Sequence, residues 1–180
     1  STGTIARRAL TLGAVAAQSK TYDGTTSEDA SKFGAVLNNV VAGEENLVKA
    51  TATGATYNDK NVAGASTINY TGVALAGAEA GNYTLAATTA QGAGTITRRA
   101  LTIDTVRAQS KTYDGNTSAD ASQFHATLGN FVAGEEGSVT ATAAGATYNS
   151  KDVRAANTVN YTGVALGGTG AGNYTLAAST

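Results

Sequence analysis

Alternation of apolar and polar side chains along short segments predicts a chain built from β-strands. Residues 9–12 alternate over Ala-Leu-Thr-Leu, and residues 46–56 carry Leu, Val and Ala in a looser alternation. A period of two residues is typical of strands that bury one face. Similar segments lie at 35–41 and 83–87, and turns rich in Gly, Asn and Asp separate the segments. This spacing predicts about six or seven strands per ~90 residues, as in a β-sandwich.

One short segment, residues 27–33, has helical character instead. Ser27 is suited to cap a helix N-terminus, and the acidic residues Glu28 and Asp29 favour the first turn of a helix. The segment is too short to be stable as an independent helix. We therefore predict a single helical turn or an irregular loop here.

The chain consists of two copies of one sequence module. Residues 18–24 (QSKTYDG) recur at 109–115, and the offset of 91 positions holds without insertion or deletion. A module of ~90 residues is large enough to fold by itself. We predict two domains, residues 1–92 and residues 93–180, joined stiffly end to end by a short linker at 86–94. Thr180 is the equivalent of Thr89, and we expect the chain to be a segment of a longer array.

Composition narrows the classes of function. Apolar residues make up 42% of the chain but aromatic residues only 6%, and 22 glycines accompany an absence of proline, which favours strands and tight turns. Charged residues amount to 14% and the net charge is −1, so we expect no nucleic-acid partner. No apolar run approaches the ~20 residues of a membrane span, and we expect no membrane insertion. Without cysteine, neither a disulfide nor a thiolate metal site can form.

Four motifs in order resemble the YDG domain, a repeat found in the stalks of very large secreted and surface-bound bacterial adhesins, including filamentous haemagglutinin-like proteins. They are KTYDGTT (20–26), NDKNV (58–62), AGNYTL (80–85) and ITRRALT (96–102). The match covers both modules. The resemblance implies an extracellular β-rich module, on the bacterial cell surface or secreted, that extends a fibre. The second module departs from the pattern at NSKDV (149–153), which weakens the case for an ion site in that turn.

The expected fold is all-β: two tandem immunoglobulin-like β-sandwich modules arranged end to end. Because the sequence does not define the strand order, β-grasp-like modules with one short helix each are the alternative. The expected function is that of a stalk or extender repeat, a monomer that projects an adhesive tip, bears mechanical load and contacts neighbouring repeats of its own chain. The alternative is that the modules themselves bind a glycan or a host or matrix protein as a cell-adhesion module.

The basic pairs at 7–8 and 98–99 lie near the junction of the modules. We expect Arg7, Arg8, Arg98 and Arg99 to bond to loop carbonyls or acids of the neighbouring module. Two pairs are too few for a heparin or membrane patch.

Enzymatic chemistry is not expected. His125 is the only histidine, and its equivalent in the first module is Gly34. A general base that is absent from one of two near-identical modules is not a good catalytic candidate. We therefore interpret His125 as a surface residue and predict that the chain is not an enzyme and needs no cofactor.

Two kinds of stabilising site remain as minority hypotheses. Loop carboxylates are ligands that calcium accepts, and the candidates are Asp23, Glu44, Glu45, Asp114, Glu135 and Glu136. A lysine–asparagine isopeptide bond beside a carboxylate (Glu44 or Glu45, and Glu135 or Glu136) is the second, with the candidate pairs Lys20 and Asn82, and Lys111 and Asn173. Ordinary turn acids and surface lysines are the simpler interpretation.

Each module contains four tyrosines, in a core that is otherwise poor in large side chains. Exposed aromatic residues in loops often bind sugars, so Tyr22 of the YDG motif invites a ligand-binding interpretation. Burial of a tyrosine removes ~150–250 Å² from water, however. We predict that the tyrosines pack in the core and that Asp23 and Gly24 form a turn.

Overall fold

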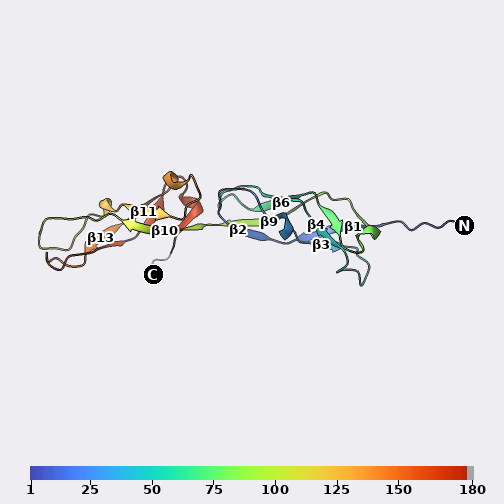
Figure 1. Cartoon of the computed structure of the whole chain (residues 1–180), viewed down its shortest axis with the longest axis horizontal. Helices are drawn as coiled ribbons and strands as arrows, with labels where there is room; N and C mark the ends of the chain where they lie inside the picture. Colours follow the sequence, from blue (N-terminus) through green and yellow to red (C-terminus); the bar gives the residue numbers. More distant parts are fainter. Residues whose placement is uncertain (178–180) are drawn as a thin grey trace. The chain divides into compact units, whose positions relative to one another are not determined.

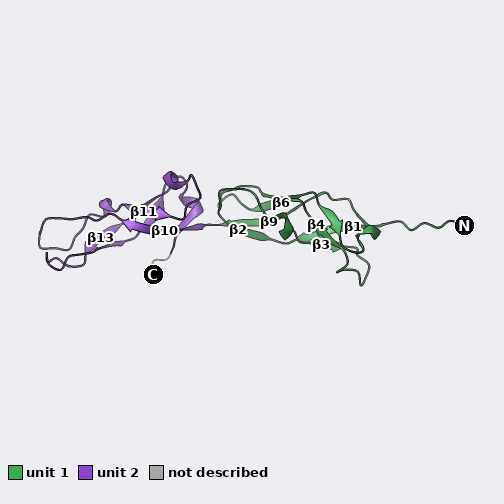
Figure 2. Ribbon diagram, viewed as in Figure 1, with its two compact units in different colours: residues 1–97 green, residues 98–180 purple. Residues whose placement is uncertain are grey.

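The computed structural model describes residues 1–177 and divides into two compact units, unit 1 (Ser1–Thr97) and unit 2 (Arg98–Thr180) (Figure 2). Both units are built from β-strands and short 3-10 turns, and residues 1–177 contain no α-helix. The all-β prediction is therefore confirmed. The boundary between the compact units lies five residues after the predicted boundary between residues 92 and 93. Residues 93–97 belong to unit 1 because they pair with its strands.

Unit 1 contains the strands and 3-10 turns β1 (Arg8–Val15), β2 (Gln18–Thr21), η1 (Ala30–Lys32), β3 (Ala35–Asn38), β4 (Lys49–Thr51), β5 (Gly54–Tyr57), β6 (Thr67–Thr71), β7 (Ala74–Ala76), η2 (Ala80–Asn82), β8 (Tyr83–Leu85) and β9 (Thr89–Thr97) (Figure 1). Unit 2 contains β10 (Arg99–Val106), η3 (Ala121–Gln123), β11 (Ala126–Gly129), η4 (Glu136–Ser138), β12 (Thr140–Thr142), β13 (Gly145–Tyr148), β14 (Val159–Thr162), β15 (Ala165–Gly167), η5 (Ala171–Asn173) and β16 (Tyr174–Leu176).

The strands of unit 1 form three small sheets, with the orders β3-β1-β8, β2-β9-β6-β5 and β4-β7. Two pairs are parallel: β1 with β8, and β2 with β9. We call β1 and β2 the N-terminal arm and β8 and β9 the C-terminal arm. The two arms run side by side in the same direction through both larger sheets.

The helical turn predicted at 27–33 is the 3-10 turn η1, and its cap differs from the prediction. The Asp29 carboxylate accepts a hydrogen bond from the Ser31 amide at 2.9 Å and so provides the N-cap. Ser27 instead forms an isolated β-bridge with Thr56. The prediction of Ser27 as the cap is wrong because a neighbouring strand engages its backbone.

Unit 1 buries its large side chains on two sheets. Leu10, Val48 and Tyr83 form one cluster around the three-stranded sheet. The four-stranded sheet buries Tyr22, Tyr57, Ile68, Tyr70 and Ile96, each at most 3% exposed. All four tyrosines of this module therefore lie in the core, as predicted.

Residues 89–97 form the longest strand of unit 1, although residues 86–94 were predicted to be a linker. β9 pairs with β2 on one side and with β6 on the other. Its buried positions alternate and are occupied by Gly92, Gly94 and Ile96. The linker prediction is wrong because these glycines allow the strand to lie close to larger side chains on β5 and β6.

Unit 2 repeats most of this arrangement, with the sheets β11-β10-β16, β13-β14 and β12-β15. Within residues 98–177, however, no strand occupies the position that β9 has in unit 1, and residues 109–112 are not part of a strand. Tyr113, the equivalent of the buried Tyr22, is 60% exposed. The prediction that every tyrosine packs in the core is therefore wrong for Tyr113, which no strand of residues 98–177 covers in the way that β9 covers Tyr22.

Candidate functional site

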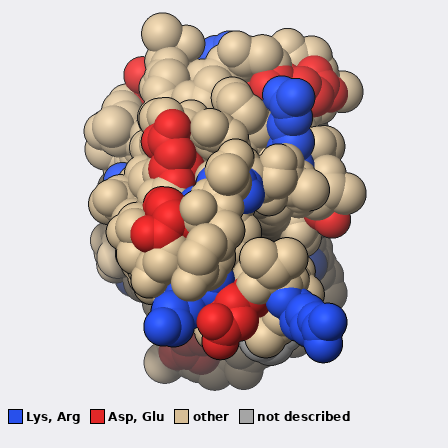
Figure 3. Space-filling view, turned by 90° about the vertical axis from the view of Figure 1, so that its left-hand side faces the viewer, with Lys and Arg blue, Asp and Glu red and all other residues tan. Residues whose placement is uncertain are grey.

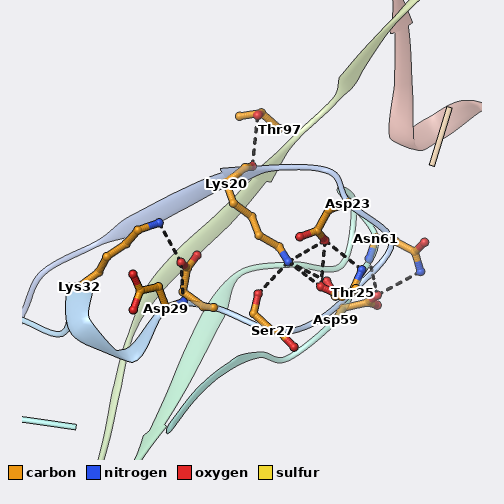
Figure 4. A network of polar contacts seen from close by, with 10 residues as sticks. Lys20, Asp23, Thr25, Ser27, Asp29, Lys32, Asp59, Asn61 and Thr97 are labelled. Carbon is orange, nitrogen blue, oxygen red and sulfur yellow. Dashed lines mark hydrogen bonds and ion pairs between the residues drawn. The ribbon is translucent and has the colours of Figure 1, made fainter. Parts of the chain in front are cut away.

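The YDG motif of unit 1 forms a loop that is organised around the ammonium group of Lys20 (Figure 4). Lys20 lies on β2, and its side chain is only 11% exposed. Its Nζ donates to the Asp23 carboxylate at 2.8 Å, to the Thr25 carbonyl and hydroxyl at 2.9 and 3.2 Å, and to the Ser27 carbonyl at 2.8 Å. Nζ also lies 5.4 Å from the centre of the Tyr57 ring. We call this arrangement the lysine hub.

Asp23 connects the hub to the turn that follows it. Its Oδ1 accepts hydrogen bonds from the amide and the hydroxyl of Thr25, at 2.9 and 3.0 Å. Gly24 has a φ of 78°, a conformation that glycine adopts without steric cost. The turn predicted at Asp23 and Gly24 is thus confirmed. The neighbouring Tyr22 is buried, and its amide donates to the Thr97 carbonyl of β9 at 2.9 Å.

Unit 2 contains the same hub around Lys111. Its Nζ donates to Asp114 at 2.8 Å and to the carbonyl and side-chain oxygens of Asn116, both at 2.9 Å, and lies 5.5 Å from the centre of the Tyr148 ring. Asn116 replaces Thr25 and supplies an equivalent oxygen. The hub is therefore a feature of the repeat, and its polar groups satisfy one another.

Removal of the hub cation should destabilise unit 1. In Lys20→Met the carbonyls of Thr25 and Ser27 lose a charged donor, and we expect a loss of about 2 kcal/mol in the free energy of unfolding. Urea denaturation, followed by circular dichroism, measures the loss. Lys60→Met, at an exposed position of the 58–66 turn, is the matched control and should change stability by less than about 0.5 kcal/mol. Equal stability of the two variants would show that water replaces the lysine.

The aspartates of the two hubs make stability depend on pH. Burial raises the pKa of Asp23, but hydrogen bonds from Lys20 and Thr25 outweigh this, and the pKa is lowered overall. The hydrogen bond from Lys111 likewise lowers the pKa of Asp114. A carboxyl group with a lowered pKa stabilises the fold above its unfolded value of ~3.9, and this contribution is lost as the pH falls below that value.

We therefore expect the urea midpoint to fall as the pH decreases from about 5 to about 2. The double variant Asp23→Asn/Asp114→Asn should show a shallower decrease over this window, since two of the groups responsible no longer titrate. A series of urea titrations at fixed ionic strength measures both slopes. An unchanged slope in the double variant would contradict the assignment.

A second polar pair recurs in both units at the end of the three-stranded sheet. The Tyr83 hydroxyl donates to Glu44 at 2.5 Å and accepts from the Val41 amide at 3.2 Å. In unit 2 the Tyr174 hydroxyl makes the same contacts with Glu135 and Val132, at 2.6 and 3.2 Å. The hydrogen bond to Glu44 raises the pKa of Tyr83. Burial raises the pKa of Tyr174, and the hydrogen bond to Glu135 raises it further. Each glutamate thus serves as the hydrogen-bond acceptor of a core tyrosine.

The calcium candidates do not converge. Asp23 and Asp114 bind their hub lysines, Glu44 and Glu135 accept from tyrosines, and Glu45 accepts from the Gly43 amide at 2.9 Å. Glu136 begins the turn η4. Within residues 1–177, no three acidic or histidine side chains lie together in a group that could hold a metal ion.

The isopeptide candidates have separate partners. Lys20 belongs to the hub on β2, whereas Asn82 lies in η2 before β8 and donates to Glu79 at 2.5 Å. In unit 2, Lys111 binds Asp114 and Asn116, and Asn173 lies in η5. Nothing in this geometry favours a lysine–asparagine bond.

Three of the four arginines, Arg8, Arg98 and Arg99, bond within their own units, contrary to the prediction. Arg8 donates to the Asn39 side chain at 2.5 Å, and Arg99 donates to the carbonyl and side chain of Asn130 at 2.6 and 2.8 Å. Arg98 donates to the Gly172 carbonyl at 3.1 Å. Asn39 and Asn130 have φ angles of 73° and 68°, and each also caps a carbonyl of the neighbouring strand. Arg8 and Arg99 therefore stabilise turns with positive φ inside their own units.

The turn motif NDKNV and its variant NSKDV play the same structural role. In unit 1, Asp59 accepts a hydrogen bond from the Asn61 amide at 2.8 Å. In unit 2, Ser150 accepts from the Asp152 amide at 3.1 Å. Either side chain forms the turn, which explains why the charge can change position between the modules.

Sequence reasoning missed one buried carboxylate, Glu28. Its side chain is 3% exposed and binds Lys32 at 2.9 Å and the Asp29 amide at 2.8 Å. Burial raises its pKa, but these bonds and the nearby Tyr57 hydroxyl lower it overall. The equivalents of Glu28 and Lys32 are Ala119 and Gln123, so this pair stabilises unit 1 and is not a property of the repeat.

The surface of the described residues carries a single histidine and mixed charges. His125 is exposed, which confirms its interpretation as a surface residue. On the face shown in Figure 3, the basic side chains are interspersed with acidic ones and form no single patch. Residues 1–177 contain no helix with the length and hydropathy of a membrane span.

Comparison with known families identifies one match. The model of the YDG domain matches the chain twice, over residues 6–90 and 97–180. No curated protein and no solved structure matches the chain.

Proposed function

Because the chain belongs to the YDG domain family and carries the domain twice, we propose that it is a structural segment of a bacterial surface adhesin. Its role is to extend the adhesin away from the cell, on the cell surface or in secreted form, and to bear mechanical load. Tandem repeats suit this role because reach increases with each copy of the module. Cell adhesion and biofilm formation are the processes in which such a segment acts.

The observation that carries this proposal is the parallel pairing of the two arms of unit 1. The N-terminal arm pairs with the C-terminal arm at Arg8↔Tyr83 in one sheet and at Thr21↔Thr97 in the other. A force applied along the chain pulls the first arm toward its N-terminal end and the second toward its C-terminal end. In this geometry the hydrogen bonds between the arms are loaded together in shear.

The direct connection between the last strand of unit 1 and the first strand of unit 2 also supports the load-bearing role. β9 completes unit 1 and ends at Thr97, and β10 of unit 2 begins at Arg99. Load therefore passes from one unit to the next through a strand that belongs to a sheet, since residues 89–97 are not a loose linker. The repeated polar clusters, whose groups are satisfied within the module, support a structural role over a ligand-binding one.

Force spectroscopy with two attachment geometries tests the proposal. In Ser1→Cys/Thr97→Cys the handles load the two arms in shear. In Thr26→Cys/Thr97→Cys they pull from the loop that follows β2 and from the end of β9, and so separate the bonds between these strands one by one. The cysteine-free chain makes the attachment specific. We expect unit 1 to unfold at a markedly higher force in the first geometry. Equal forces would overturn the load-bearing role.

A glycan and matrix-protein binding array with the whole chain tests the alternative. An absence of binding on the array supports the spacer role. Saturable binding to one receptor would instead show that the modules act in cell adhesion themselves.

A further inference from the structure

The buried carboxylate of Glu28 uses only one of its two oxygens in hydrogen bonds with the protein. Oε1 accepts from the Lys32 ammonium at 2.9 Å and from the Asp29 amide at 2.8 Å. The side chain is 3% exposed, and Oε2 is buried with no hydrogen-bond partner among residues 1–177. A carboxylate oxygen that is removed from water without a partner is costly. Glu28 Oε2 therefore requires a donor that the protein groups around it do not supply.

Two tyrosine hydroxyls of unit 1 are buried in the same way, without a hydrogen-bond partner among the described residues. They belong to Tyr57 on β5 and Tyr70 on β6, which are 3% and 1% exposed. The strands pair Ala55 with Tyr70 and Tyr57 with Ile68, and these four residues occupy the buried positions of the two strands. Both rings therefore project from the inner face of the sheet, as diagonal neighbours. A buried tyrosine hydroxyl normally has a hydrogen-bond partner.

The backbone brings the Glu28 carboxylate to these two hydroxyls. The Glu28 amide donates to the Ala55 carbonyl of β5 at 3.1 Å. Phe33, which follows η1, packs on the Tyr70 ring with 4.7 Å between the ring centres. Burial raises the pKa of both Tyr57 and Tyr70, and the nearby carboxylate of Glu28 raises it further. Three buried oxygens thus face one part of the interior, and no hydrogen bond joins any two of them.

The charge and the hydrogen-bonding pattern of this site favour one small neutral ligand. The Lys32 ammonium lies 2.9 Å from the Glu28 carboxylate and already balances its charge, so a bound cation would gain little. The ligand has to donate to a carboxylate oxygen and to accept from two phenol hydroxyls. Water can do both at once, and internal water molecules typically make about three hydrogen bonds to buried polar groups that are otherwise unsatisfied.

We propose that unit 1 binds one internal water molecule between Glu28, Tyr57 and Tyr70. The water donates to Glu28 Oε2 and accepts from the two hydroxyls, so that it joins the segment 27–33 to β5 and β6. This short segment is then held on the sheet by a hydrogen-bonded bridge as well as by the packing of Phe33. The second module has Ala119 in place of Glu28 and lacks the carboxylate of this site. The water site does not depend on the proposed role in an adhesin.

A high-resolution crystal structure of the whole chain tests the site directly. We expect one density peak at hydrogen-bond distance, about 2.6–3.2 Å, from Glu28 Oε2 and from the hydroxyls of Tyr57 and Tyr70. A direct hydrogen bond between Glu28 and Tyr57 with no such peak would overturn the proposal. A peak whose coordination identifies a metal cation would overturn it as well.

Oxygen-17 magnetic relaxation dispersion tests the site in solution, because it counts the water molecules that stay bound to the protein. Glu28→Met keeps the length of the side chain and removes the acceptor. This variant should hold about one bound water molecule fewer than the parent chain. Glu45→Met, at an exposed loop position, is the matched control and should keep the number of the parent. An equal number in Glu28→Met and the parent would contradict the water site.

Removal of single hydroxyls gives a test that depends on the sign of the change. Tyr70→Phe keeps the ring on Phe33, and loss of the hydrogen bond to the water should lower the urea midpoint. If the hydroxyl had no partner at all, its removal would relieve a desolvation cost and raise the midpoint. A raised midpoint would therefore overturn the proposal.

The combination of two such substitutions tests whether the hydroxyls share one ligand. In Tyr57→Phe/Tyr70→Phe the decrease in the midpoint should be smaller than the sum of the two single decreases, because both substitutions act on the same water. In Tyr70→Phe/Tyr83→Phe the decreases should add, since the Tyr83 hydroxyl has its own partners in Glu44 and Val41. Additive decreases in both double variants would show that Tyr57 and Tyr70 do not share a water molecule.

Discussion

A fragment that ends at Thr88 is expected to lose most of the stability of a fragment that ends at Thr97. The shorter fragment lacks β9, which pairs with five residues of β6 and four of β2. Burial of Ile96 alone contributes about 1.5–3 kcal/mol, and Tyr22 and Ile68 lose their cover as well. We expect a loss of about 4 kcal/mol or more, which is a large part of the about 5–15 kcal/mol of a typical domain.

Chemical denaturation and amide exchange of the fragments 1–97 and 1–88 measure this effect. The matched control is fragment 7–97, which removes a similar length from the other end. Residues 1–6 are exposed and unpaired, so this fragment should be as stable as 1–97. Addition of a synthetic peptide of residues 89–97 should restore the protection of residues 18–21 in fragment 1–88. Equal stability of 1–88 and 1–97 would show that β9 is not part of the folding unit.

Gly94→Val is expected to destabilise unit 1 by about 3 kcal/mol. The new side chain has no room, because its Cβ would lie 2.5 Å from Ile68 and 2.9 Å from Tyr57, and both residues are buried in the sheet. Either these side chains leave their positions or β9 moves away from β6. Thermal unfolding should show a decrease of more than about 10 °C in the midpoint for unit 1.

Gly3→Val provides the control for this substitution in the same chain. Gly3 occupies the same position of the sequence repeat, but nothing lies within 4 Å of its Cβ direction. We expect no change in the stability of unit 1, so that one substitution at two equivalent sites gives opposite results. A small effect of Gly94→Val would mean that the close approach of β9 to Ile68 is relaxed in solution.

Several features followed from the sequence because they depend on short stretches of chain. The alternation at 9–12 predicts β1, in which Leu10 is 2% exposed. The Asp-Gly pair predicts the turn at Gly24, since glycine adopts positive φ without cost. The motifs at 20–26 and 80–85 likewise predicted the resemblance to the YDG domain, and the model of that family matches both modules.

Other predictions failed where distant contacts override local preference. Residues 86–94 resemble a linker because glycine is unfavourable in strands, yet they enter β9, where the space beside Ile68 and Tyr57 accepts only glycine. The lysine hub was also missed, because Lys20 approaches Tyr57 across 37 residues of sequence. The acidic Glu28 resembled a helix-start residue, whereas in the structure its side chain is only 3% exposed and interacts with Tyr57, 29 positions further along the chain.

The amino-acid sequence by itself determined the duplication, the all-β class and the turns, because residue identity and local periodicity decide these. The tertiary structure alone decided which strands complete which unit. Tyr22 and Tyr113 stand in identical motifs, yet one is 1% exposed and the other 60% exposed. Tyr22 is buried because β9, a strand about 70 residues away along the chain, covers it, and a local pattern contains no record of such a distant contact.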